Sequence, residues 1–171
     1  VMGEHLGKWD EGQRFLEGLK QNKAFTKETE ADRSLQRSIA VMQLGQNEET
    51  RLEVFGRSDQ IRIMAITASA LSERNTVRAQ ELLQKALHLA RLGIVKRHPA
   101  NLALSITGNN LAGDVEEKKP RSPAETDLRI VAAKIGREYW EIAGTWMEVS
   151  KAEIRLAMTY IAANDLARAL K

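Results

Sequence analysis

The sequence contains no cysteine, and this absence excludes three kinds of site. A disulfide scaffold, a zinc site with thiolate ligands and a catalytic cysteine all require this residue. Aromatic residues are also few, since Phe, Trp and Tyr make up only 5% of the 171 residues. Alanine and leucine supply most of the hydrophobic residues instead. Because β-sheets favour β-branched and aromatic side chains, this composition predicts an all-α fold with closely packed helices.

Long apolar segments are missing as well. The sequence contains no run of about 18 apolar residues, the length that a membrane-spanning helix needs. No charged and then apolar leader opens the sequence. We therefore expect a soluble chain that does not span a membrane, and a cytoplasmic location.

Charge of one sign does not dominate. Lysine and arginine number 26 against 23 acidic residues, which gives a net charge of +3. Nucleic-acid-binding proteins usually carry a concentrated basic stripe. The nearest candidates are two short basic groups, namely Arg91, Lys96 and Arg97, and then Lys118, Lys119 and Arg121. Ordinary solvated surface explains them better, so nucleic-acid binding remains the less favoured alternative.

Catalytic motifs are absent too. The three histidines, His5, His88 and His98, have no second ligand at a recognised metal-binding spacing. The sequence has no glycine-rich phosphate loop and no serine in a nucleophile elbow. We therefore predict that the protein is not an enzyme, and we expect no cofactor.

Helical periodicity runs through most of the chain, with apolar residues repeating at intervals of three and four. Ser122 is a good N-cap before Pro123, and Gly144 a plausible C-cap. No segment alternates like a strand, and no linker divides the chain, so a single helical domain over residues 1–171 is expected. The helical periodicity is strong over residues 57–171 and weaker over 1–56. Their expected ranges are 9–21, 28–44, 57–74, 77–97, 99–112, 123–143 and 145–163, with a further helix starting at 166 and a polar loop over 113–121.

The last two helices contain the clearest internal repeat unit. Leu156 and Ala157 form a large and small pair, Tyr160 follows three residues later, and a turn at 164–165 precedes Ala169. This pattern resembles a tetratricopeptide repeat, in which small residues let paired helices approach closely. Gly108 takes the place of the small residue in an earlier unit, so we expect a close helix contact there.

The resemblance covers residues 57–171 and is degenerate. First helices that start near residues 57, 99 and 145 are spaced by about 42–46 residues, longer than a standard tetratricopeptide repeat. The spacing would also suit HEAT-like helix pairs. The predicted fold is therefore a tetratricopeptide-like α-solenoid that continues beyond residue 171, with an irregular helical bundle as the alternative.

The resemblance implies a non-catalytic module that binds a peptide or a partner helix on the concave side of the solenoid. The first helices of the pairs line that side, and their polar residues would suit an acidic peptide or a carboxylate terminus. A nucleic-acid-binding or ligand-sensing regulatory domain is the alternative. The candidate partner-binding residues are Arg62, Ser69, Ser105, Asn109, Lys151 and Arg155.

Overall fold

The computed structural model describes residues 7–46, 50–96, 98–118 and 120–170. Within these ranges the chain forms eight α-helices and one short 3-10 helix, and no strand. The prediction of an all-α fold is therefore confirmed. The helices are α1 (Trp9–Leu19), α2 (Glu30–Gly45), η1 (Leu52–Val54), α3 (Arg57–Leu71), α4 (Thr76–Arg91), α5 (Pro99–Glu117), α6 (Pro123–Ala143), α7 (Trp146–Ala162) and α8 (Leu166–Ala169).

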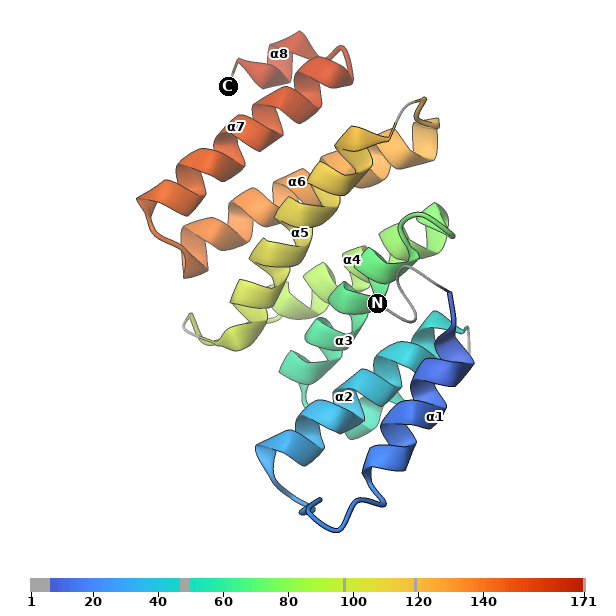
Figure 1. The fold of residues 1–171 in the computed structure, drawn as a ribbon. Helices are drawn as coiled ribbons and strands as arrows, with labels where there is room; N and C mark the ends of the chain where they lie inside the picture. The colour runs from blue at the N-terminus through green and yellow to red at the C-terminus, as the bar shows by residue number, and fades with distance from the viewer. Residues whose placement is uncertain (1–6, 47–49, 97, 119, 171) are drawn as a thin grey trace.

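Consecutive helices pack against one another along the molecule. The helices α1 and α2 lie at one end, α3 to α6 occupy the middle, and α7 and α8 lie at the other end (Figure 1). A connected hydrophobic core runs from α2 to α6, with Ile61, Leu83, Leu104 and Leu128 fully buried. In α7, only Leu156 reaches this core, as a partly buried neighbour. None of the described helices is both long and apolar enough to cross a bilayer.

Local sequence signals set several helix ends. Ser122 and Glu125 form a reciprocal capping box at the start of α6, and Gly144 caps its end. The side chain of His98 caps α5 by accepting the backbone N–H of Ala100. Asn75 caps α4 in the same way. These interactions satisfy backbone groups that a helix end leaves without a partner.

The prediction of a loop over residues 113–121 is wrong for residues 113–117, which are helical. The helix α5 continues to Glu117, because Val115 is buried in the core and Glu116 contacts two arginines on neighbouring helices. These tertiary contacts outweigh the polar character of the segment. The helices expected to end at 74 and 97 end earlier, at Leu71 and Arg91, and positions 97 and 171 lie outside the described residues.

Candidate functional site

The helices α3, α5 and α7 each leave one side uncovered. The hydroxyl of Ser58 lies 2.8 Å from Nδ1 of His98, which aligns the starts of α3 and α5. An ion pair of 3.2 Å between Glu116 and Arg155 joins α5 to α7. We call the uncovered sides together the odd-helix surface. It comprises Arg62, Ile66, Ser69 and Glu73 from α3 and the turn after it, Leu102, Ile106, Asn109, Gly113 and Glu117 from α5, and Met147, Lys151, Ile154, Arg155 and Met158 from α7.

Five of the six predicted partner-binding residues line depressions on this surface. Ser69, Asn109 and Arg155 line one of about 470 Å³ between α3, α5 and α7. Asn109 and Arg155 also line the next, of about 310 Å³, together with Lys151. Arg62 lines a third, of about 200 Å³, between α2 and α3, and pairs with Asp59 at 3.6 Å. These five side chains therefore lie on the odd-helix surface.

Ser105 is the exception, and its expected surface position is wrong. The residue is fully buried on the side of α5 that its neighbours cover. Its hydroxyl donates a hydrogen bond of 2.8 Å to the backbone carbonyl of Leu102 within the same helix. Ser105 therefore belongs to the helix packing and does not reach a partner at the surface.

Arg155 lies on the surface, but it already has an acidic partner within the fold. Its Nη1 lies 3.2 Å from one carboxylate oxygen of Glu116, and the other oxygen lies 3.0 Å from Nη2 of Arg129. Arg129, on α6, is 2% exposed, and its burial lowers its pKa, an effect that Glu116 opposes. The absence of a side chain at Gly113 leaves room for Arg155, because a Cβ there would come within 3.0 Å of Nη1. Glu116 thus links three helices.

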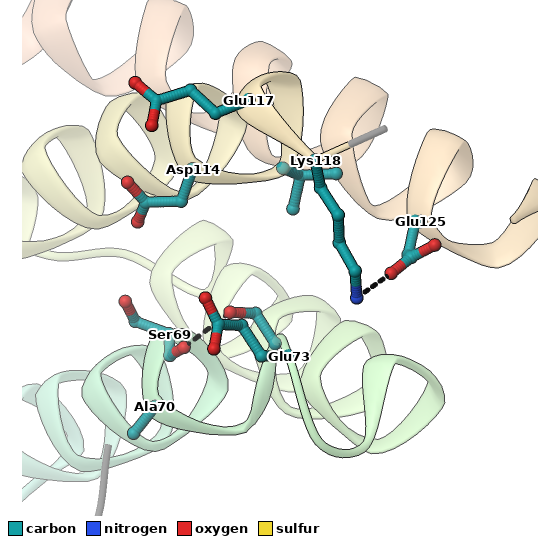
Figure 2. Close-up of a pocket in the computed structure, with 9 residues that line it drawn as sticks. Ser69, Ala70, Glu73, Asp114, Glu117, Lys118 and Glu125 are labelled. Carbon is teal, nitrogen blue, oxygen red and sulfur yellow. Dashed lines mark hydrogen bonds and ion pairs between the residues drawn. The ribbon is translucent and has the colours of Figure 1, made fainter. Parts of the chain in front are cut away.

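Carboxylates gather at the other end of the odd-helix surface, which the sequence did not reveal. A depression of about 570 Å³ separates the ends of α3 and α5, with Glu73 on one side and Asp114 and Glu117 on the other (Figure 2). Lys118 at its edge forms an ion pair with Glu125. This pair and hydrogen bonds from Ser122 lower the pKa of Glu125 to about 2. The surface is therefore acidic between α3 and α5, whereas α7 adds two cations, Lys151 and the paired Arg155.

Exposed apolar residues are the second feature that sequence reasoning missed. The helical spacing of Ile154, Ala157 and Ile161 predicts a stripe packed against another helix, but Ile154 and Ile161 are 65% and 49% exposed. The helix α7 instead packs through a side that buries Ala152, Thr159 and Tyr160. Both sides of α7 carry apolar residues, so periodicity alone could not decide which side is covered.

Several of the histidines and basic residues singled out in the sequence have roles in helix capping or ion pairs within the fold. His98 caps α5, His88 lies exposed on α4, and His5 lies outside the described residues. Arg91 pairs with Glu138 at 2.9 Å, in addition to the pair between Lys118 and Glu125. Positions 97 and 119 of the basic groups are outside the described part of the chain. Among the described residues, no three His, Asp or Glu side chains are grouped so that they could hold a metal ion.

No family model, curated protein or solved structure matches this chain. The tetratricopeptide-like repeat therefore stays a prediction from the sequence.

Proposed function

We propose that this protein is a non-catalytic interaction module, built as a tetratricopeptide-like α-solenoid, that binds a segment of another protein. The binding site is the odd-helix surface. Stacked helix pairs commonly present their first helices to a partner, because each pair adds one strip to an extended surface.

The observation that carries this proposal is that the depressions continue from one to the next across three helices. The depression between the ends of α3 and α5 shares Ser69 with the next one. That depression in turn shares Asn109 and Arg155 with the one beside α7. Neighbouring depressions that share walls form one groove. A groove that crosses successive helices suits a peptide or helix laid across them.

Exposed aliphatic side chains support the proposal further. Ile66 on α3, Ile106 on α5 and Ile154 on α7 are 48%, 41% and 65% exposed on a surface that they share with polar and charged side chains. Apolar anchors that are surrounded by polar groups are typical of protein interfaces, where they supply most of the binding free energy.

The charges along the groove refine the partner that the sequence suggested. An acidic peptide finds a free cation at Lys151, which makes no ion pair with any described residue. Glu73 and Glu117 at the opposite end favour basic side chains. We therefore propose a segment that is acidic where it meets α7 and basic where it meets α3, which would fix its direction across the helices.

The test is selection of binding peptides from a random display library on the wild-type protein. Selected peptides are then measured by fluorescence anisotropy against the double variant Ile106→Glu, Ile154→Glu. The matched control is Val54→Glu, Val77→Glu, which changes two residues of comparable or greater exposure away from the groove. We expect at least tenfold weaker binding to the first variant only.

Two results would contradict the proposal. Either no peptide is enriched, or the enriched peptides bind both double variants as tightly as wild type. Salt-sensitive binding of a single-stranded or double-stranded oligonucleotide by a protein that enriches no peptide would favour the nucleic-acid alternative.

A further inference from the structure

One face of α7 has the spacing of a helix-pairing seam. Residues 147, 151, 154, 158 and 161 follow one another at intervals of four, three, four and three. Such a repeat places five side chains in one line along a helix, as the core positions of a coiled coil are placed. Met147, Ile154, Met158 and Ile161 are 46%, 65%, 47% and 49% exposed. We call these five residues the α7 seam.

The neighbouring helix pair shows what covers such a line elsewhere in the fold. The helix α5 is paired with α6 over most of its length, and Leu104, Gly108 and Leu111 are buried between α5 and its neighbours. The helix α8 has only four residues and follows the C-terminal end of α7 (Figure 1). Most of the α7 seam therefore has no described helix against it.

We propose that the α7 seam receives an amphipathic helix from a partner protein, one that carries a glutamate or aspartate facing Lys151. The inference rests on the proposed function and names the class of segment that binds at the α7 end. The partner helix has its own apolar residues at intervals of three and four, which interlock with the two methionines and two isoleucines of the seam. Methionine side chains adapt readily to such a contact.

Charge complementarity sets the acidic character of the partner helix. Lys151 lies within the seam, and no described carboxylate pairs with it. Glu116, which lines the same depression, already pairs with Arg129 and Arg155. Lys151 is the only charged residue among the five of the seam, so an acidic residue of the partner helix would complement it. A single charged residue within a seam also fixes the register of the partner helix.

A second copy of this chain fits the seam less well, because α7 offers no free carboxylate. Glu148 accepts the backbone N–H of Thr145 at 2.8 Å within the cap of α7. Glu153 pairs with Arg137 of α6 at 2.5 Å. In a pairing of two α7 helices, Lys151 would then meet apolar residues instead of an acid.

The test uses two display libraries on the wild-type protein, one of helical peptides with leucines at the seam spacing and random flanks, and one of random linear peptides. We expect the helical library to be enriched in peptides with an acidic residue at one constant position. Their affinity, measured by fluorescence anisotropy, should fall at least tenfold for Ile154→Glu and for Lys151→Glu. The matched controls are Val77→Glu and Lys85→Glu, two exposed residues of α4. Replacing the conserved peptide acid by lysine should restore binding to Lys151→Glu.

Three results would overturn the inference. Enrichment of linear peptides alone would exclude a partner helix but would still support the proposed peptide-binding function. Enrichment of neither library would contradict both the partner helix and the proposed function. A wild-type dimer in sedimentation experiments that Ile154→Glu converts to monomer would identify a second copy as the occupant of the seam.

Discussion

Gly108 of α5 and Gly136 of α6 bring the backbones of their helices into direct contact. A Cβ on Gly108 would lie 2.5 Å from the backbone nitrogen of Gly136 and 2.6 Å from the carbonyl oxygen of Ala132. The close helix contact predicted at Gly108 is therefore confirmed. We expect Gly108→Leu to lower the free energy of unfolding by roughly 1–3 kcal/mol or more, because backbone atoms cannot move aside as a side chain can. Chemical denaturation followed by circular dichroism measures this change.

The control for this substitution is Gly18→Ala on α1. A Cβ there meets no atom within 4 Å, so the loss of backbone freedom in the unfolded chain should stabilise the protein by up to about 1 kcal/mol. Equal stability of Gly108→Leu and wild type would show that α5 and α6 do not meet in this way.

Much of the fold could be read from residues close in sequence, and much of the candidate site could not. The caps at Ser122 and Gly144 depend on local backbone geometry, and the sequence predicts both. The burial of Ser105 and the pairing of Arg155 with Glu116 depend on which helices come together. Helical periodicity alone does not specify those neighbours, so sequence reasoning placed both side chains as free surface groups.

The buried guanidinium of Arg129 depends on Glu116. Removing the carboxylate by Glu116→Gln leaves a positive charge in the interior with no acidic partner, although Glu116 itself is partly exposed. We expect a loss of about 2–3 kcal/mol in the free energy of unfolding. The comparison is Glu138→Gln, which breaks the exposed pair with Arg91 and should cost less than about 1 kcal/mol. A similar cost for both variants would contradict a special role of Glu116.

Glu125 should make stability depend on pH in the acidic range. Lys118 and Ser122 lower the pKa of Glu125 from 4.5 to about 2 in the folded protein. A carboxyl group whose pKa is depressed by folding stabilises the protein above its unfolded pKa, and this contribution is lost as pH falls toward 2. We expect wild type to melt at a higher temperature than Glu125→Gln at pH 7. The gap in melting temperature should narrow between about pH 4.5 and 2, and a gap that stays constant would contradict the assignment.

The helix α7 should open before α5 and α6. Only three of its 17 residues are buried, and two ion pairs, between Arg137 and Glu153 and between Glu116 and Arg155, hold it to its neighbours. Local opening is easiest where few apolar contacts must break. We expect amide hydrogens of α7 to exchange faster than those of α5 in hydrogen–deuterium exchange mass spectrometry. Added salt should increase the difference, because it screens partly exposed ion pairs. Equal protection of α5 and α7 at every salt concentration would refute this expectation.

Lys151 and Arg155 lie one helical turn apart on α7, and the structure predicts that reversing their charges has different consequences. Lys151 is exposed and makes no described ion pair, so Lys151→Glu should change the free energy of unfolding by less than about 0.5 kcal/mol. Arg155→Glu instead breaks a pair and places a second carboxylate beside Glu116, which should cost more than about 1 kcal/mol.

Thermal denaturation of the two single variants at pH 7 and low salt tests this contrast in stability. When Arg155→Glu is combined with Glu116→Gln, the two substitutions should cost less together than the sum of their separate costs, since the double variant lacks the repulsion between the two carboxylates. Equal melting temperatures for the two single variants would mean that Glu116 does not hold Arg155. If the contrast is found, weaker partner binding by Lys151→Glu reports on the surface alone, whereas weaker binding by Arg155→Glu also reports on the attachment of α7.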